Sequence, residues 1–250
     1  MNGRVAVFRM NRLLRSAFRR VGLEIQIVPL PRHKIVTRGS ELRNQLLNSQ
    51  VNWLRVPMYE SITSSLAKQG GPGYLEGKSA IEIGGSEGTI ARALKSLGAS
   101  IQVAPDYPLV DAENLPYAAG AFDVVVLDQI LEHLKHPWIA VDQIRRVLRS
   151  GGICVSTSVF VYPLHRGFVG SFDDYYRFSP QGFRALFEGF KILESDGWGN
   201  ADVLRLAYNH SDRGPEGTDP VQKQEADRLG LYDRKDEMNY LMTWCIAQKA

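Results

Sequence analysis

The sequence predicts an α/β protein built on a doubly wound, mostly parallel sheet. From Lys78 onward, short apolar runs typical of strands alternate with amphipathic stretches typical of helices. The run 122–127 is almost continuously apolar, as expected of a strand that is buried on both faces. A glycine-rich turn follows the first run, at residues 84–88. In such a sheet a ligand binds at the carboxyl ends of the strands.

The elements follow from these patterns. In this part of the chain we predict strands over 79–83, 101–104, 122–127, 153–158, 190–194 and 240–247, and helices over 89–97, 137–148 and 183–187. Before it, we predict a helix over 10–21, a short strand over 23–27, and helical structure over 40–69 with Pro57 as a break or a new first turn. The glycine-rich stretch 70–73 separates a basic N-terminal helical extension or cap, residues 1–73, from a catalytic domain, residues 74–250.

Composition excludes several classes of protein. The 250 residues are 44% hydrophobic and 23% charged, which fits one sizeable globular domain with a small appendage. Cys154 and Cys245 form no C-x-x-C pair, so a zinc cluster and a disulfide scaffold are excluded. We find neither an apolar run of about 18 residues nor a secretory pattern, and we therefore expect a cytoplasmic protein.

The net charge of +3 is unevenly distributed. Residues 1–38 hold nine basic residues and one acidic residue, which leaves 21 basic and 26 acidic residues, or −5, for the remainder. We expect this basic segment to meet an anionic membrane surface, to form a homodimer contact, or to dock on the chain's own body.

The glycine-rich turn indicates a ligand site. Small residues at Gly84, Ser86 and Gly88 let a ligand approach the backbone between a strand and a helix. The turn lacks the G-x-G-x-x-G spacing of dinucleotide sites. Glu82 is an acid inside an otherwise apolar strand, and its burial is costly unless a cation or a donor meets it. The pattern therefore favours a ligand with a positively charged amino group.

Five motifs occur in an order that resembles the class I S-adenosylmethionine-dependent methyltransferases. They lie at residues 82–88 (E-I-G-G-S-E-G), 111–116, 122–126, 130–133 and 146–152. The resemblance covers roughly residues 78–160. It implies a Rossmann-like sheet of seven strands whose last strand, near residues 240–247, runs antiparallel.

The resemblance also implies which residues hold S-adenosylmethionine. Glu82 would hold the methionine amino group through the turn, Asp106 the ribose hydroxyls, and Asp111 with the backbone of Ala112 the adenine edge. The remaining cofactor residues would be Gly84, Gly85, Ser86 and Gly88 in the turn, and Asp128 and Gln129 beside the reactive methyl group. Only four residues separate Asp106 from Asp111, too few for a helix, so one wall of the adenine pocket is abbreviated or is supplied by the N-terminal extension.

The acceptor site is predicted after the fourth and fifth strands. His133 and His165 are candidate catalytic residues together with Asp174, because a hydroxyl acceptor needs a base that works near neutral pH. The stretch 174–180 resembles a D-Y-Y-R-F-[ST]-P segment in a bacterial branch of these enzymes, which makes Tyr175, Tyr176 and Arg177 candidate substrate-binding residues. The alternative is structural, with Asp174 paired to Arg177 and Ser179 capping a helix.

We predict no metal ion at this site. In some ubiquinone-type O-methyltransferases a similar E-x-x-E-H run binds a divalent cation. Here Gln129 stands at the first position of that run.

Three functions remain open. The first is methyl transfer to a small molecule, at a hydroxyl of a sugar or secondary metabolite. The second is nucleic-acid methylation with the basic segment as its electrostatic footprint, which is disfavoured because the body is acidic and no N-P-P-Y-type motif follows the fourth strand. The third is a non-catalytic scaffold that binds S-adenosylmethionine and uses its basic segment to reach a membrane or partner.

Overall fold

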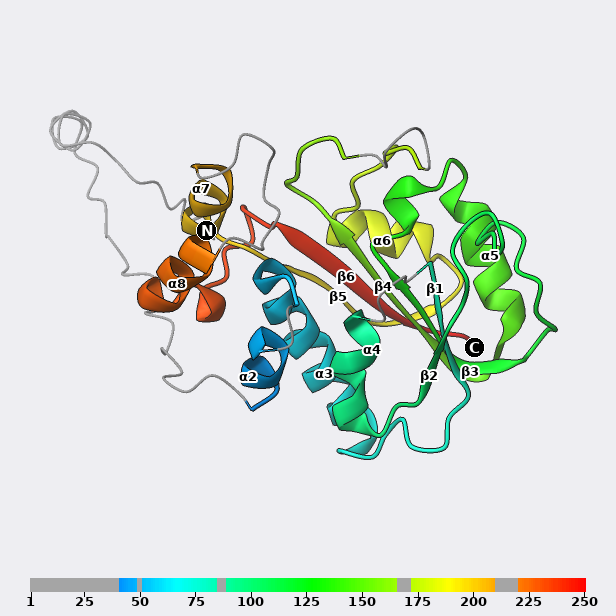
Figure 1. Ribbon diagram of the computed structural model, residues 1–250. Helices are drawn as coiled ribbons and strands as arrows, with labels where there is room; N and C mark the ends of the chain where they lie inside the picture. Colours follow the sequence, from blue (N-terminus) through cyan, green and yellow to red (C-terminus); the bar gives the residue numbers. More distant parts are fainter. Residues whose placement is uncertain (1–40, 49–50, 85–88, 166–171, 210–219) are drawn as a thin grey trace, which may run out of the picture. The chain divides into compact units, whose positions relative to one another are not determined.

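The computed structural model describes residues 41–48, 51–84, 89–165, 172–209 and 220–250 (Figure 1). All of them belong to one compact unit, residues 36–250. The predicted helix over 10–21, the predicted strand over 23–27 and the basic segment lie outside the described residues, so their structure and their partner stay predictions.

The unit contains a mixed sheet of six strands among the described residues, in the order β2-β1-β3-β4-β6-β5 (Figure 1). The strands are β1 (Ala80–Ile83), β2 (Ile101–Val103), β3 (Phe122–Asp128), β4 (Leu148–Val159), β5 (Lys191–Trp198) and β6 (Met242–Gln248). Strands β1 to β4 pair in parallel, whereas β6 runs antiparallel to both β4 and β5. The mostly parallel Rossmann-like sheet and its antiparallel last strand are therefore confirmed.

The predicted number of seven strands is not confirmed. Between β2 and β3 the chain makes neither a helix nor a strand, and its only bridge in this segment joins Asp111 to Asn114. Strand β2 is consequently the edge of the sheet, and Val103 is 40% exposed there. The short connection after Asp106 is the physical reason, because it leaves too little chain for a helical crossover to a further strand.

Alternate residues of the central strands pack on opposite faces of the sheet. Val124 and Val126 belong to one hydrophobic cluster, and Val125 and Leu127 to the other. This period of two, with both faces buried, is what the continuous apolar run of β3 predicts. Helices α5 (Pro137–Val147) and α6 (Pro180–Leu186) cover one face, and α3 (Val56–Gly70) and α4 (Thr89–Leu94) cover the other (Figure 1).

The helices before the sheet pack into its core. Helix α2 (Glu41–Asn48), the 3-10 turn η1 (Trp53–Arg55) and α3 share one hydrophobic cluster with the strands. Pro57 lies in the first turn of α3, as predicted, where its missing N–H costs no helical hydrogen bond. The division of the chain at residue 73 stays a prediction.

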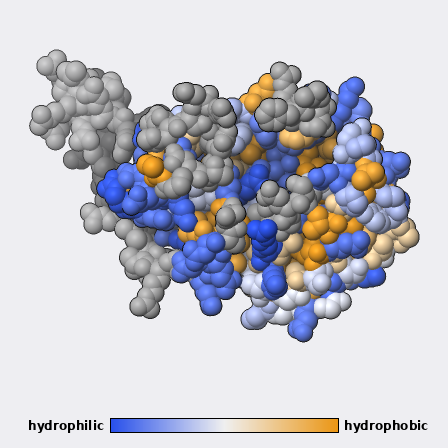
Figure 2. Space-filling model, in the orientation of Figure 1, coloured by the Kyte–Doolittle hydropathy of each residue, from blue (hydrophilic) through white to orange (hydrophobic). Residues whose placement is uncertain are grey.

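Several elements after β5 were not predicted. They are α7 (Ala201–Asn209), α8 (Pro220–Leu229) and the 3-10 turn η5 (Leu231–Asp233). Two further short 3-10 turns complete the described structure, η2 (Lys95–Leu97) and η3 (Leu131–His133). Figure 2 shows the molecule in the orientation of Figure 1. On the described part of the face seen there, polar and apolar residues are intermixed. Among the described helices, none combines the length and apolarity that crossing a bilayer requires.

Candidate active site

The carboxyl ends of three adjacent parallel strands bring polar side chains together. Glu82 of β1 is in register with Val126 of β3, and Asp128 at the end of β3 is in register with Thr157 of β4. Because side chains alternate along a strand, Glu82, Asp128 and Thr157 all point to the face that α3 covers. The predicted cofactor residues Glu82 and Asp128 therefore share one face and one edge of the sheet.

Glu82 is a buried acid that lacks a partner at one oxygen. Its side chain is 1% exposed, and Oε2 has no hydrogen-bond partner among the described residues. Burial, together with the nearby charge of Asp128, raises the pKa of Glu82 to about 8, although the backbone N–H of Ala91 opposes this shift. Such a group is unstable as an anion on its own and is ready to meet a cation.

Asp128, in contrast, is fully partnered. Its Oδ2 accepts a hydrogen bond from Tyr59 Oη at 2.6 Å, and its Oδ1 accepts one from Thr157 Oγ1 at 2.5 Å. Arg55 Nη1 lies 3.7 Å from Oδ2. Burial and the Asp128 charge raise the pKa of Tyr59 well above its usual value, so the phenol stays a donor. Helix α3 and the turn before it thus complete the coordination of this carboxylate.

The backbone bends sharply after both strands. Gly84 adopts φ +71°, a conformation that strains any residue with a side chain, and a Cβ there would lie 2.6 Å from Ile130 Cδ1, so the Ile130 side chain would have to move. Gln129 is the only non-glycine described residue with positive φ, at 58°. Its N–H is directed to Thr157, at 3.0 Å from Oγ1, which holds this unfavourable conformation in place. The other turn residues Gly85, Ser86 and Gly88 lie outside the described residues.

The predicted ribose and adenine residues follow β2. Asp106 is exposed, three residues beyond the end of β2. Asp111 accepts a hydrogen bond from the N–H of Glu113 at 2.8 Å, and Ala112 is buried. The N–H of Ala104 donates to the carbonyl of Glu82 at 2.8 Å, so this segment starts directly beside β1. The positions agree with the sequence expectation, while the roles of Asp106, Asp111 and Ala112 stay predictions.

Both predicted histidines meet near the ends of β3 and β4. The rings of His133 and His165 make an edge contact with centroids 4.7 Å apart. His133 Nδ1 lies 2.7 Å from the carbonyl oxygen of Asp173, and His165 Nδ1 lies 3.1 Å from Asp174 Oδ2. Burial lowers the pKa of each imidazole, so both rings are neutral near pH 7.

Asp174 and Arg177 form the structural pair that the sequence offered as an alternative. Arg177 Nη2 donates to Asp174 Oδ2 at 2.7 Å and to the carbonyl of Pro163 at 2.9 Å. Although burial opposes it, hydrogen bonds from Arg177 and the backbone of His165 lower the pKa of Asp174 to about 2. The pair therefore anchors the loop that carries His165. Ser179 caps α6, as predicted, by accepting from the N–H of Gly182 at 3.0 Å.

The two tyrosines of this segment differ in exposure. Tyr175 is 45% exposed and donates to Asp173 Oδ2 at 3.0 Å, whereas Tyr176 donates to the carbonyl of Lys135 at 3.1 Å. Arg177 donates hydrogen bonds to Asp174 and to the carbonyl of Pro163, so it positions the loop that carries His165. Substrate contacts of Tyr175, Tyr176 and Arg177 remain untested.

Sequence reasoning missed four residues of the site. Tyr59, Arg55 and Thr157 surround Asp128, and Glu132 is completely buried beside His133. A tyrosine in an apolar helix gives no signal of a contact 69 residues away. Glu132, in contrast, stands next to His133 in a run that the sequence analysis considered, but only the structure shows that it is buried.

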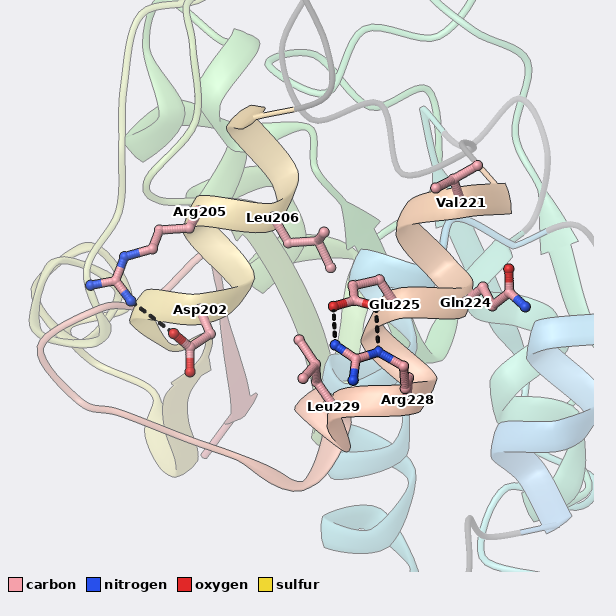
Figure 3. Close-up of a pocket in the computed structure, with 8 residues that line it drawn as sticks. All are labelled: Asp202, Arg205, Leu206, Val221, Gln224, Glu225, Arg228 and Leu229. Carbon is pink, nitrogen blue, oxygen red and sulfur yellow. Dashed lines mark hydrogen bonds and ion pairs between the residues drawn. The ribbon is translucent and has the colours of Figure 1, made fainter.

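A hollow of about 680 Å³ lies elsewhere, between α7 and α8 (Figure 3). Its two arginines are already neutralised, Arg205 by Asp202 at 2.8 Å and Arg228 by Glu225 at 2.5 Å. None of its lining residues comes from the strand ends that carry Glu82 and Asp128. We therefore place the candidate active site at the strand ends.

Comparison with known proteins agrees with this placement. Residues 62–156 match the family model of a methyltransferase domain. Uncharacterized methyltransferases of two Mycobacterium strains, KMS and MCS, are 29% identical over 104 residues, which cover 35% of this chain and 41% of each relative. The chain thus matches about two fifths of the length of these curated relatives.

Solved structures with a similar arrangement include two methyltransferases. A putative sarcosine dimethylglycine methyltransferase from Galdieria sulphuraria is 16% identical, with a TM-score of 0.46 over 94% of this chain and 97% of that chain. Phosphoethanolamine N-methyltransferase 2 of Haemonchus contortus is 16% identical, with a TM-score of 0.49 over 89% of this chain and 61% of that chain.

The fold and the strand-end site define a Rossmann-like, ligand-binding α/β domain. Together with the family-model match over residues 62–156, they indicate a class I S-adenosylmethionine-dependent methyltransferase domain. S-adenosylmethionine is the cofactor of that family. The residues present fit it, because the unpartnered buried Oε2 of Glu82 matches an ammonium group, and the chain turns sharply at Gly84 directly after that strand.

We predict that Tyr59→Phe lowers the free energy of unfolding by about 1.5–3 kcal/mol, since it removes a hydrogen bond to a buried carboxylate. Chemical denaturation measures the change. Tyr107→Phe is the matched control, because Tyr107 is 69% exposed, and it should change stability by less than about 0.5 kcal/mol. Equal effects of the two variants would contradict the role given to Tyr59.

Glu82 also predicts a dependence of stability on pH. Its carboxyl group titrates near 4.5 in the unfolded chain and at about 8 in the folded protein. Between these values the folded state binds more protons, so the stability of the unloaded protein falls as the pH rises. In Glu82→Gln the fall between about pH 5 and pH 8 should be smaller. A residual fall should remain, because burial also raises the pKa of Glu132 to about 7. Denaturation at several pH values measures both, and identical profiles would contradict the prediction.

Proposed function

We propose that the protein transfers a methyl group from S-adenosylmethionine to a hydroxyl of a small molecule, such as a sugar or a secondary metabolite. The observation that carries the proposal is the buried Oε2 of Glu82, which has no partner and lies beside the turn at Gly84, inside the segment that matches the methyltransferase family. A methionine ammonium group supplies the missing cation. The cofactor provides an electrophilic methyl group, and the chain's own residues position the reactants.

The residues around the strand ends divide this work. Glu82 receives the amino group of the cofactor, and Asp106 accepts hydrogen bonds from the ribose hydroxyls. Asp128 is held by Tyr59 and Thr157 and forms a fixed floor beside the reactive methyl group. Holding both reactants in line is the main contribution a protein makes to such a displacement.

The acceptor is proposed to lie at His133 and His165. Both rings are neutral near pH 7, so each can accept a proton. In His133 the accepting atom is Nε2, because Nδ1 donates its proton to the carbonyl oxygen of Asp173. Asp174 orients His165 and stabilises its charged form once a proton arrives. A hydroxyl between these rings and the methyl group loses its proton as the new O–C bond forms.

Calorimetry tests the cofactor. S-adenosylmethionine should bind in the micromolar range and NAD should not bind. Near pH 7 the binding should release about one proton, because the arriving ammonium group ionises Glu82. Measurements in buffers of different ionisation enthalpy detect that proton. Asp106→Ala should weaken binding by about 1.5–3 kcal/mol.

Asp142→Ala is the control for Asp106→Ala, since its side chain is 72% exposed and meets only Arg145, at 3.9 Å. It should leave cofactor affinity unchanged. Binding of NAD in place of S-adenosylmethionine would overturn the proposed function. Unchanged affinity in Asp106→Ala would remove the ribose role from that residue alone.

The acceptor side is tested by His165→Ala and Asp174→Ala. Both should lower turnover, His165→Ala by about 10²-fold or more, while cofactor affinity stays nearly constant. Transfer of labelled methyl groups to a panel of hydroxylated sugars and metabolites measures turnover. A loss confined to cofactor affinity or thermal stability would return both residues to a structural role. Tight cofactor binding without transfer to any acceptor would favour a scaffold.

A further inference from the structure

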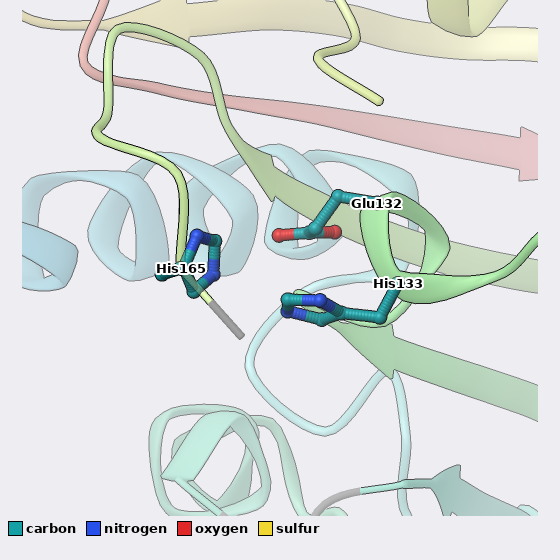
Figure 4. Close-up of side chains that lie close together, drawn as sticks. All are labelled: Glu132, His133 and His165. Carbon is teal, nitrogen blue, oxygen red and sulfur yellow. The ribbon is translucent and has the colours of Figure 1, made fainter. Parts of the chain in front are cut away.

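We propose that Glu132, His133 and His165 form a binding site for a divalent first-row transition-metal ion. Each of the three residues offers one ligand atom, and these atoms lie within 4.8 Å of one another. Figure 4 shows the Glu132 carboxylate and the far ends of both imidazole rings turned toward a common space. Two ligands of one such ion stand roughly 3–4 Å apart at bond lengths of about 2.1 Å. A small movement of the side chains therefore closes the site around an ion.

The two histidines are held as metal-binding histidines are. The backbone carbonyl of Asp173 accepts from His133 Nδ1 at 2.7 Å, and a carbonyl can only accept, so the proton of that ring is on Nδ1. The carboxylate of Asp174 lies 3.1 Å from His165 Nδ1 without the alignment of a hydrogen bond, and its negative charge favours a proton on that nitrogen. With the proton on Nδ1, the Nε2 atom of each ring keeps a lone pair for a metal ion. A ring N–H directed to a carbonyl or carboxylate is the usual support of a metal-ligating imidazole.

Glu132 provides a second and independent observation. Its side chain has no exposed surface, and its Oε2 has no hydrogen-bond partner among the described residues. Its Oε1 accepts a long hydrogen bond, at 3.4 Å, from the N–H of Val159, and the pKa of Glu132 is still raised by burial although Ser158 and the charge of Arg55 oppose this. A carboxylate buried in this way is costly unless a cation meets it. A metal ion held by the two rings would lie next to the Glu132 carboxylate and would supply that positive charge.

The backbone keeps the three residues together. Glu132 and His133 lie in η3, and the carbonyl of Glu132 accepts from the N–H of Tyr175 at 2.8 Å. Arg177 donates hydrogen bonds both to Asp174 and to the carbonyl of Pro163. It thereby ties the loop that carries His165 to the segment that contains Tyr175. The site is thus built from three stretches that are fixed to one another by hydrogen bonds.

The ligand set selects the class of ion. Two imidazole nitrogens and one carboxylate suit Zn²⁺, Fe²⁺, Mn²⁺ or Ni²⁺, whereas Mg²⁺ and Ca²⁺ prefer oxygen ligands throughout. The sequence argued against a metal because Gln129 replaces an acid. In the structure His165, 32 residues after His133, offers a third ligand. A local run of residues such as 129–133 cannot reveal a ligand so far along the chain.

An ion at this place would change one step of the proposed methyl transfer, and this part rests on the proposed function. The acceptor hydroxyl would bind the ion and lose its proton more easily, because a divalent cation lowers the pKa of a coordinated hydroxyl. His165 would then be a ligand of the ion, and the proton would leave to solvent instead of to the ring. The metal site itself stands on geometry alone.

The experiment is a titration of the full chain, free of any affinity tag and stripped with chelator, with ZnCl₂ and separately with CoCl₂. We expect one ion per chain by elemental analysis after dialysis, and visible absorption bands from bound Co²⁺. His165→Asn and Glu132→Gln should each lower Zn²⁺ affinity by at least about tenfold. His136→Asn is the matched control, because His136 pairs with Glu113 at 3.0 Å outside the cluster, and it should bind as the wild type does.

Two results would overturn the site: no saturable binding of either ion, or unchanged affinity in His165→Asn. Since Glu132 is wholly buried, the partly exposed His165 keeps the test valid if Glu132→Gln fails to fold. Cofactor binding is measured on the same samples. Zn²⁺ binding without S-adenosylmethionine binding would overturn the proposed function and leave the metal site, and the reverse result would do the opposite.

Discussion

The burial of Asp128 at the end of β3 is the constraint on which the arrangement of the site depends. A carboxylate removed from water is tolerated only where donors surround it. Tyr59 and Thr157 supply hydrogen bonds, and Arg55 supplies a positive charge. Arg55 and Tyr59 belong to the segment that precedes the sheet in the chain, so α3 must lie against the carboxyl ends of the strands. The helix is therefore part of the framework that holds Asp128 in place.

The three buried acids near the strand ends differ in how far the protein satisfies them. Asp128 is bonded at both oxygens, whereas Glu82 and Glu132 each retain one buried oxygen with no partner among the described residues. A bonded acid serves the framework, and an acid left open marks a place for a cation. On this argument the strand ends carry two separate subsites for a positively charged group, one beside the glycine turn and one beside the histidines.

Local patterns were sufficient for most of the sheet and for one side of the site. The central strand β3 was predictable because it is an apolar run whose burial on both faces needs no knowledge of its neighbours. The edge strands β2 and β5 were predictable from short β-type runs, although they are only partly buried. Gly84 and Glu82 were predictable because a tight turn and an acid within a strand are exceptional in any context. The predicted seventh strand came from resemblance and is not found among the described residues, and the short connection after Asp106 already argued against a further crossover.

Other features depend on contacts that spacing does not encode. Tyr59 reaches Asp128 from a helix that precedes the sheet by many residues, and His165 lies near Glu132 in a loop that Arg177 and Asp174 hold in place. Helix α7 was missed although its buried apolar residues recur at helical spacing, at Val203, Leu206 and Ala207. Helix α8 gave a weaker signal. Helix α8 buries few of its ten residues, so its sequence is mostly polar and its apolar period is weak.

The electrostatics of the unloaded site follow from the same burial. Desolvation raises the pKa of Glu82 and of Glu132 and lowers the pKa of both histidines, so each group moves toward its neutral form. The site consequently carries less charge than its two glutamates and two histidines would carry in water. A ligand that carries positive charge reverses this balance, because it stabilises the ionised carboxylates and displaces their protons. Ligand binding and proton release are thus coupled by the desolvation that made the site.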